Sequence, residues 1–163
     1  QYQLPIKDAV NFAGECFKNG VGGFVLFGIP EKKDEMGSGA YSKNGVIQNC
    51  VRAIKDRFPD IPIFCDVCLC EYTSHGHCGV VVQKNNGYII DNDRTLELLA
   101  KTAVSLADSG ADFVCPSAMM DMQVDAIRKA LDGEGFQDVG MKVHHGSEIG
   151  QHIKWTRQMQ ERH

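Results

Sequence analysis

Short apolar runs alternate with helical segments along most of this chain, and this alternation limits the folds that the chain can adopt. The runs read GFVLFGIP (23–30), IPIFCDV (61–67) and ADFVCPS (111–117). Continuous apolar runs of this length, bounded by glycine, proline or polar residues, are typical of strands covered on both faces in a parallel sheet. We therefore predict a strand at each run, and the first two should be buried on both faces.

Apolar residues recur at three- and four-residue spacing around these runs, which predicts helices. The helical stripes cover residues 6–17, 46–54, 96–107 and 121–131. Gly20 and Gly110 follow the first and third stripes as C-terminal stops, and we expect Asn92 or Asp93 to cap the third.

Repeated strand–helix units with short connections indicate an α/β fold, in which helices pack against a parallel sheet. Either a doubly wound sheet or part of a (β/α)₈ TIM barrel fits the pattern. A complete barrel needs about 250 residues, so a chain of 163 residues supplies about half of one. The pair Asn86-Gly87 inside VVVQKNNGYII (80–90) predicts a β-hairpin turn within this framework.

Composition excludes several classes of protein. The net charge is −4 with scattered basic residues, which argues against a nucleic acid or an anionic membrane as a partner. No apolar run reaches membrane-spanning length, and QYQLPIKDAV at the N-terminus has no signal-peptide core, so we expect a cytoplasmic protein.

The polar loop 31–45 is interpreted either as a solvated connection or as a lid beside a site.

The segment CDVCLCEYTSHGHCG (65–79) holds four of the seven cysteines and two histidines. In a cytosolic chain, where thiols stay reduced, so dense a group is typical of a metal site rather than of a disulfide scaffold. If the strand from Ile61 continues to Cys70, then Asp66, Cys68 and Cys70 share one face, and Cys65 is a buried apolar residue on the other.

Cys68, Cys70 and Cys78 form a Cys-x-Cys-x₇-Cys pattern, unlike the paired spacing of structural zinc knuckles. Three thiolates leave one corner of a tetrahedral zinc open, which is typical of a catalytic or substrate-binding metal. His75 or His77 either supplies the fourth metal ligand, orients another ligand or acts as a proton shuttle. A thioredoxin-like Cys65–Cys68 pair is a weaker alternative, because its two thiols would face opposite ways.

These residues resemble a known family. CDVCLCEYTSHGHCG is similar to the zinc-binding segment of cysteine-rich porphobilinogen synthase, also called δ-aminolevulinic acid dehydratase. The segments FVLFGIP and KDEMGS extend the similarity upstream, and CPSAMMD resembles the family's APSDMMDG, so that it covers about Leu4 to Met141. The resemblance implies a (β/α)₈ barrel, usually octameric, that condenses two molecules of 5-aminolevulinate into porphobilinogen for haem and tetrapyrrole synthesis.

The resemblance also implies roles for individual residues. It makes Cys68, Cys70 and Cys78 the zinc ligands, with Asp66 beside the zinc for proton transfer or for orienting a substrate amine. Ser117 matches a family serine in the active site.

The match to the family's catalytic machinery is incomplete. The first of the two lysines that form Schiff bases with substrate in the family falls at Gly146, and Lys142 is out of register with it. The second lysine belongs to later strands. Ala118 replaces an acidic residue. No matched Schiff-base lysine is therefore expected, and the chain alone should be weakly active or inactive.

We expect two regions, a partial barrel over 1–141 and a divergent tail over 142–163. The tail carries His144, His145 and His152, which we interpret as solvent-facing. It is either the end of a truncated product read in another frame or part of a short paralogue. The alternative to an enzyme is a non-enzymatic zinc-binding remnant that joins other subunits, since an open half barrel exposes strand edges and favours homo-oligomers.

Overall fold

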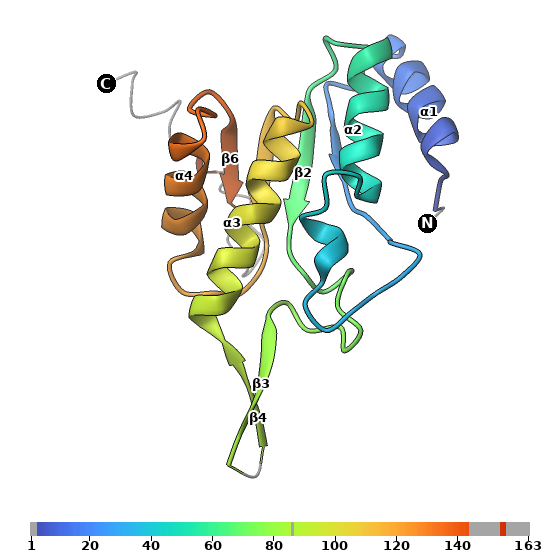
Figure 1. Cartoon of the computed structure of the whole chain (residues 1–163). Coiled ribbons are helices and arrows are strands. Elements are labelled where there is room, and N and C mark those ends of the chain that lie inside the picture. The colour runs from blue at the N-terminus through green and yellow to red at the C-terminus, as the bar shows by residue number, and fades with distance from the viewer. Residues whose placement is uncertain (1–2, 86, 144–153, 156–163) are drawn as a thin grey trace.

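The computed structural model describes residues 3–85, 87–143 and 154–155 (Figure 1). The elements in these ranges follow in the order α1 (Ile6–Lys18), β1 (Phe24–Leu26), the 3₁₀-helix η1 (Ser38–Ala40), α2 (Val46–Arg57), β2 (Ile63–Val67), β3 (Val80–Lys84), β4 (Gly87–Asp91), α3 (Asn92–Asp108), β5 (Phe113–Pro116), α4 (Gln123–Gly133), β6 (Gly140–Val143) and β7 (Lys154–Trp155).

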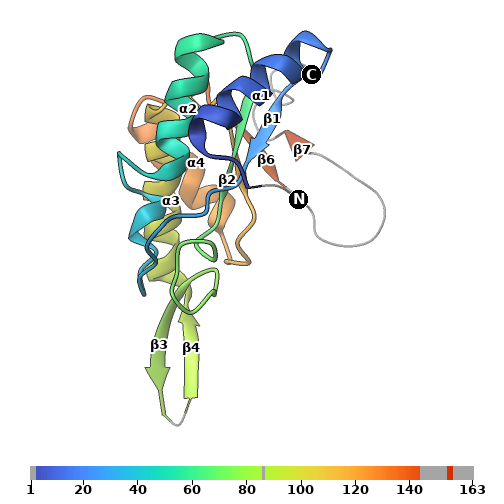
Figure 2. The ribbon, with the colours of Figure 1, turned by 90° about the vertical axis from the view of Figure 1, so that its right-hand side faces the viewer.

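The main sheet has the strand order β1-β2-β5-β6-β7. Strands β1, β2, β5 and β6 are parallel to their neighbours, whereas β7 runs antiparallel to β6. Each parallel strand lies beside the next one along the chain, and α2, α3 and α4 cover one and the same face of the sheet (Figure 2). A doubly wound sheet would reverse its strand order and place helices on both faces. The fold is therefore an arc of a (β/α) barrel.

The two faces of the sheet have different environments, and β2 illustrates the difference. Ile63, Cys65 and Val67 are fully buried on the face covered by the helices. Phe64 and Asp66 alternate with them and are half-buried on the opposite face, which we call the open face. In a complete barrel this face would line the interior, so polar and charged groups on it are candidates for a site.

The four predicted helices are confirmed, each within a few residues of its expected bounds. The cap of α3 was predicted one or two residues too late. The carboxylate of Asp91 accepts a hydrogen bond from the backbone N–H of Arg94 at 3.1 Å, so Asp91 is the N-cap and Asn92 is the first helical residue. Gly20 and Gly110 take φ of +91° and +99° after their helices, as helix stops commonly do.

The strands predicted at 61–67 and 111–117 are confirmed as β2 and β5, and a strand within 23–30 is confirmed as β1, but the expectation that this first strand is buried on both faces is wrong. Only Phe24–Leu26 form a strand there, and Val25, Phe27 and Ile29 are 39%, 63% and 53% exposed. The reason is the position of β1 at the edge of the sheet. Within the described residues β1 has one strand neighbour, so its apolar side chains are only partly covered.

The hairpin predicted at 80–90 is confirmed, and it projects from the body of the molecule (Figures 1 and 2). Its turn lies earlier than predicted. Gly87 is already paired with Lys84 in the strand register, and Asn85 takes a φ of 52°. Asparagine tolerates this left-handed conformation better than most residues, which is why it can replace glycine in the turn.

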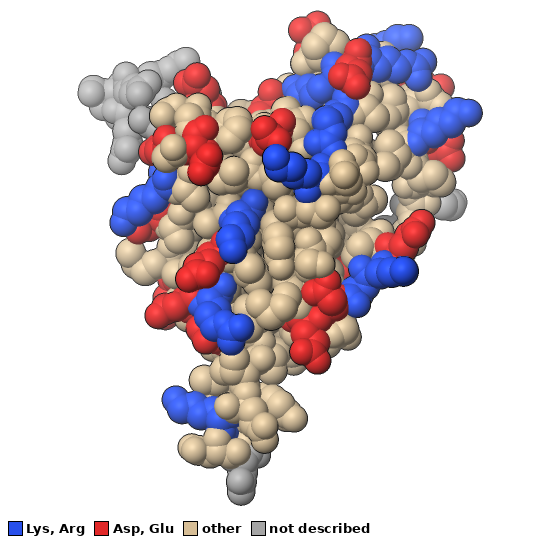
Figure 3. Space-filling view, in the orientation of Figure 1, with Lys and Arg blue, Asp and Glu red and all other residues tan. Residues whose placement is uncertain are grey.

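None of the helices in the described ranges is both long and apolar enough to cross a membrane. Acidic and basic side chains are interspersed on the face seen in Figure 3. The expected boundary between residues 141 and 142 falls inside strand β6 and stays a prediction. His144, His145, Gly146 and His152 lie outside the described residues.

Candidate metal centre

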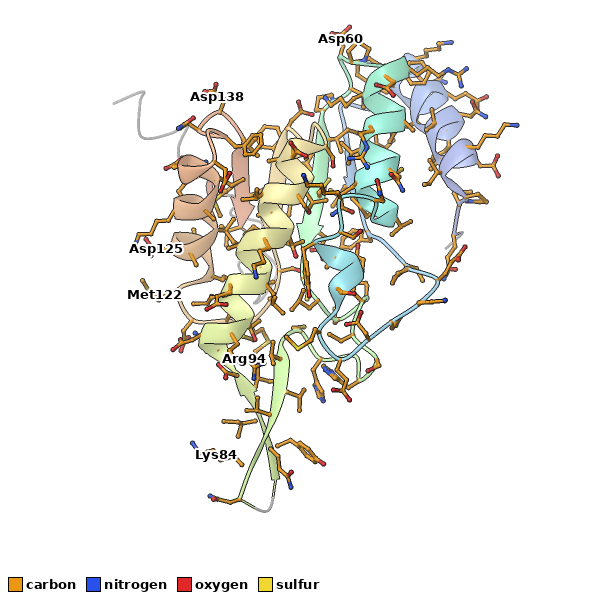
Figure 4. The ribbon with its side chains drawn as sticks, in the orientation of Figure 1. Asp60, Lys84, Arg94, Met122, Asp125 and Asp138 are labelled. Atoms are coloured by element: carbon orange, nitrogen blue, oxygen red, sulfur yellow. The ribbon has the colours of Figure 1, made fainter. Side chains whose placement is uncertain are left out.

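The cysteine segment lies at the carboxyl end of β2, where parallel α/β folds place their sites. Figure 4 shows the two ends of the molecule. Asp60 and Asp138 mark the end at which β2 and β6 begin, and Arg94 and Lys84 mark the other end, from which the hairpin projects. Cys68 directly follows the last residue of β2 and therefore belongs to the second end.

Strand β2 ends at Val67, so the prediction that it continues through Cys70 is wrong. A turn follows instead, in which the Leu69 carbonyl accepts hydrogen bonds from the backbone N–H groups of Tyr72 and Thr73, both at 2.9 Å. This turn, rather than strand alternation, places the sulfur of Cys68 3.4 Å from that of Cys70.

The chain returns to this turn through the histidine-containing loop. The Thr73 hydroxyl donates to the His77 carbonyl at 2.8 Å, and the backbone N–H of His77 donates to Nδ1 of His75 at 3.1 Å. Gly76, with a φ of +75°, allows the reversal. The result is that Cys78 meets the other two cysteines, and the three sulfur atoms all lie within 4.8 Å of one another.

The histidines take positions around the loop rather than among the sulfurs. Nδ1 of His75 accepts a hydrogen bond, so Nε2 carries the proton and donates to the Glu35 carbonyl at 3.2 Å. His77 is exposed, and the rings of the two histidines lie 5.5 Å apart. Neither imidazole joins the three-sulfur group within the described residues. Their action around a bound metal stays a prediction.

The polar loop 31–45 packs against the cysteine loop and is not simply a solvated connection. Asp34 forms an isolated parallel bridge with Thr73, in which its N–H donates to the Tyr72 carbonyl at 3.3 Å and its carbonyl accepts from Ser74 at 2.9 Å. Its carboxylate also accepts from the backbone N–H groups of Met36 and Ser38. No pattern in the sequence predicts that the loop 31–45 and the cysteine loop are joined by backbone hydrogen bonds.

The three cysteines are free thiols in an environment that favours their neutral form. Cys68 is buried, whereas Cys70 and Cys78 are half-buried. Burial raises the pKa of Cys68 to about 11 and that of Cys70 to about 12, and it raises the pKa of Cys78 as well. A divalent cation would replace these protons, so metal binding should release protons and strengthen as the pH rises.

The donor set fits a thiolate-preferring metal. With bonds of about 2.3 Å to zinc, sulfur ligands at tetrahedral corners are about 3.8 Å apart. The observed separations, 3.4 Å for one pair and at most 4.8 Å for the group, need only small side-chain adjustments to reach that value. Among the residues that the structure describes, the group has three thiols and no fourth donor, which leaves one coordination position for another ligand.

Glu71 is a neighbour of the cluster that the sequence pattern did not single out. Its carboxylate accepts from the thiol of Cys70 at 3.3 Å. The negative charge contributes to the raised pKa of Cys70 and of Cys78. Its position next to Cys70 in the sequence was the only available signal, and acidic residues beside cysteines are too common for that signal to be specific.

The side chain of Asp66 on β2 meets that of Ser117, which directly follows the last residue of the neighbouring strand β5. Burial raises the pKa of the Asp66 carboxyl to about 6, the hydroxyl of Ser117 opposes this rise, and the charge of Glu71 adds to it. A carboxyl with this pKa exchanges its proton near neutral pH, as proton transfer to a substrate requires. The backbone N–H of Ser117 also donates to the Val67 carbonyl at 3.3 Å, which fixes the end of β5 against the end of β2.

Cys65 is fully buried on the helix-covered face, as predicted, and burial raises its pKa. Its environment is the opposite of what a reactive thiol of a thioredoxin-like pair needs. Lys142 lies on the open face with its Nζ 5.6 Å from the ring centroid of Phe64.

Comparison with known proteins agrees with this geometry. The family model for delta-aminolevulinic acid dehydratase matches residues 1–144. The delta-aminolevulinic acid dehydratase of Archaeoglobus fulgidus is 55% identical over 136 residues, which are 83% of this chain and 41% of the relative. The Bacillus subtilis enzyme is 49% identical over 134 residues, or 82% of this chain and 39% of the relative. The chain thus spans about two-fifths of these relatives.

A solved structure provides an independent match to the fold. The crystal structure of delta-aminolevulinic acid dehydratase (porphobilinogen synthase) from Toxoplasma gondii ME49, in complex with the reaction product porphobilinogen, superimposes with a TM-score of 0.83 at 39% identity. The match covers 88% of this chain and 41% of that one, consistent with a partial barrel. Both the family model and the superposition extend over most of the described fold, and the chain belongs to the delta-aminolevulinic acid dehydratase family, a family of lyases.

Proposed function

We propose that this chain carries the metal-binding part of a porphobilinogen synthase, in which Cys68, Cys70 and Cys78 hold a zinc ion beside a binding site for 5-aminolevulinate. The observation that carries this proposal is the group of three free thiols within 4.8 Å at the carboxyl end of β2, inside a family match over residues 1–144. The soft, all-sulfur donor set favours zinc over magnesium or calcium, which prefer oxygen ligands.

Zinc bound by three thiolates has a net formal charge of −1, so it would be a weak Lewis acid with one exchangeable position, suited to positioning a substrate amine or carbonyl rather than to polarising it strongly. The residues of the chain would act around it. Asp66 would orient the substrate ammonium and take up or return its proton, because its pKa of about 6 lies near working pH. Ser117 would hold the Asp66 carboxylate, and the sheet would exclude water from one side of the substrate.

The chain by itself would turn over 5-aminolevulinate slowly or not at all. A Schiff base needs a lysine whose free amine is held against the substrate carbonyl, and neither family lysine has a match in the sequence. Lys142 lies on the open face but rests over the ring of Phe64. In the assembled protein, the cytoplasmic formation of porphobilinogen for haem and other tetrapyrroles would be the function served by this site.

Metal analysis of the purified chain tests the zinc site. Native mass spectrometry should find one zinc ion per chain after reconstitution. Replacing Cys68, Cys70 and Cys78 together by serine should abolish binding, while the control Cys16→Ser, outside the cluster, should leave it intact. Zinc retained by the triple variant, or absent from the folded wild-type chain, would contradict the proposal.

Borohydride trapping tests the expectation of weak activity. Reduction in the presence of 5-aminolevulinate should leave the mass of the chain unchanged, because no Schiff base forms to be reduced. A covalent adduct on Lys142 would show instead that a displaced lysine can start the reaction.

A non-enzymatic role in joining subunits is the second candidate. The side chains of Phe27 and Ile29 are more than half exposed after the edge strand β1. Apolar groups at an open edge favour contact with another polypeptide.

A further inference from the structure

A compact turn over residues 34–38, which we call the clasp, is shaped by the side chain of its first residue. The Asp34 carboxylate accepts hydrogen bonds from the backbone N–H of Met36 at 2.9 Å, from that of Ser38 at 3.1 Å and from the Ser38 hydroxyl. An aspartate that bonds to backbone N–H groups just ahead of it stabilises a turn in this way. The Ser38 hydroxyl, followed by these N–H groups, holds the pKa of the Asp34 carboxyl below its ordinary value, so the group stays ionised at neutral pH.

The clasp is bonded to the cysteine loop, residues 68–78. The backbone N–H of Asp34 donates to the Tyr72 carbonyl at 3.3 Å, and its carbonyl accepts from the backbone N–H of Ser74 at 2.9 Å. Nε2 of His75 donates to the Glu35 carbonyl at 3.2 Å. All three bonds reach the part of the cysteine loop between its second and third cysteines.

Gly37 brings the clasp into contact with the turn that gathers the first two cysteines. A Cβ at this position would lie 3.3 Å from Cγ2 of Thr73, 3.4 Å from Cβ of Tyr72 and 3.6 Å from Cβ of Leu69. The Leu69 carbonyl closes that turn by accepting from Tyr72 and Thr73. The clasp therefore packs against the same three residues that set the distance between the sulfurs.

Little else in the backbone pairs with the cysteine loop. It contains neither helix nor strand, and the bridge between Thr73 and Asp34 is its one β-type pairing among the residues that the structure describes. Two of its three sulfurs, those of Cys70 and Cys78, are only half-buried. The conformation that brings the sulfurs together thus depends strongly on the contacts with the clasp.

We propose that Asp34 is a positioning residue of the metal centre: its carboxylate shapes the clasp, and the clasp holds the cysteine loop in the conformation that gathers the three sulfurs. This inference rests on the proposed function, because those sulfurs are the ligands proposed for zinc. Asp34 acts through the backbone of Tyr72 and Ser74 rather than through a bond to the metal. Removing groups that hold metal ligands in place weakens metal binding about 10–100-fold.

Competition with a chromogenic chelator measures the zinc affinity of the full chain and its variants. Asp34→Ala should weaken zinc binding about tenfold, mainly through faster release to EDTA, because the sulfurs are held together less firmly. Asp34→Asn should retain most of the affinity, since the side-chain oxygen of asparagine can accept the same bonds from backbone N–H groups. Asp60→Ala makes the same change at the opposite end of the molecule (Figure 4) and should leave zinc binding unchanged.

Gly37→Ala tests the same inference through packing. Its methyl group would press on Thr73 and Tyr72 at a left-handed φ of +61°, so this variant should also weaken zinc binding. In both variants Co²⁺ should give the thiolate absorption of the wild-type chain, because the ligands are the same and only their positioning is impaired. Loss of that absorption, or unchanged zinc affinity in both variants, would overturn the proposal. Thermal denaturation of the metal-free chains checks that each variant is folded.

Hydrogen exchange in the metal-free chain separates this inference from the proposed function. The amide of Ser74, which bonds to the Asp34 carbonyl, should exchange faster in Asp34→Ala than in the wild type or in Asp34→Asn. Faster exchange across residues 68–78 in a chain that binds no zinc would support the hold of Asp34 on the cysteine loop and refute the zinc site. Stoichiometric zinc binding with unchanged affinity in Asp34→Ala would overturn the positioning role and leave the zinc site standing.

Discussion

Asp66 combines a costly environment with a central place in the site. Burial holds its pKa near 6, about two units above the ordinary value for an aspartate, so the folded state opposes its ionisation. The hydroxyl of Ser117 stabilises the ionised carboxylate, whereas the negative charge of Glu71 destabilises it. Such groups are typical of functional sites, where stability is given up for reactivity.

The substitution Asp66→Asn should therefore stabilise the metal-free protein at neutral pH. The pKa of this carboxyl is higher in the folded state than in the unfolded state. Below about pH 4 the carboxyl is protonated in both states and costs no stability, whereas the free energy of unfolding falls as the pH rises from 4 through 6. The variant, which has no charge to bury, should gain about 2 kcal/mol over the wild type above pH 7. Urea unfolding between pH 4 and 8 measures this gain.

The exposed control Asp138→Asn should leave the free energy of unfolding nearly unchanged across the same range. A constant difference between Asp66→Asn and the wild type at every pH would mean that the aspartate is not buried in its ionised form.

Strand β6 is the element whose local packing most affects the open face. Gly140 begins it, and the absence of a side chain there lets the ring of Phe113 lie flat and stack on Phe64. A single methyl group would occupy the space of the ring, since its carbon would lie 2.2 Å from Phe113. The stacking of these two rings therefore depends on a glycine for close approach and not for an unusual backbone conformation.

Gly140→Ala should destabilise the protein by about 1–3 kcal/mol, as overpacking in a close-packed region does. Gly133→Ala, near the end of α4, is the matched control. No atom lies within 4 Å of a Cβ at position 133, so alanine should be neutral or stabilising by about 0.5 kcal/mol. Thermal and urea denaturation compare the two; equal effects would mean that the Phe113 ring can move aside at little cost.

Most elements could be predicted from periodicity, whereas the cysteine loop could not. Helical stripes and apolar runs specify α2, β2, α3 and β5, because burial on one face dictates their patterns. The meeting of Cys68 with Cys70 depends on a turn at Leu69 that no periodicity marks. Residue type and resemblance predicted that these cysteines would lie together as metal ligands; the structure brings the sulfurs together, the ligand role stays a prediction, and the expected strand geometry was wrong.

At the scale of the whole molecule, the fold is an arc of parallel strands with helices on one side only (Figure 2). The alternation of elements predicted this class, but it could not distinguish a barrel from a doubly wound sheet, since both share the same local units. It also predicted too much burial for β1, because coverage of an edge strand depends on neighbours that local sequence does not specify.

The exposed apolar edge at β1 should make the purified chain self-associate. Light scattering should give a mass above 18.0 kDa that increases with protein concentration. Phe27→Lys, at a side chain 63% exposed, should shift the chain towards monomer without loss of helical signal. A strictly monomeric wild-type chain at high concentration would contradict this expectation.

The backbone bridge between Asp34 and Thr73 fastens the cysteine loop to a segment almost forty positions earlier in the chain. Much of the entropy lost in gathering three thiols has therefore already been spent when the protein folds. An excised peptide of the same fifteen residues would have to lose that freedom on meeting an ion, so tight capture of metal is a property of the folded scaffold more than of the motif.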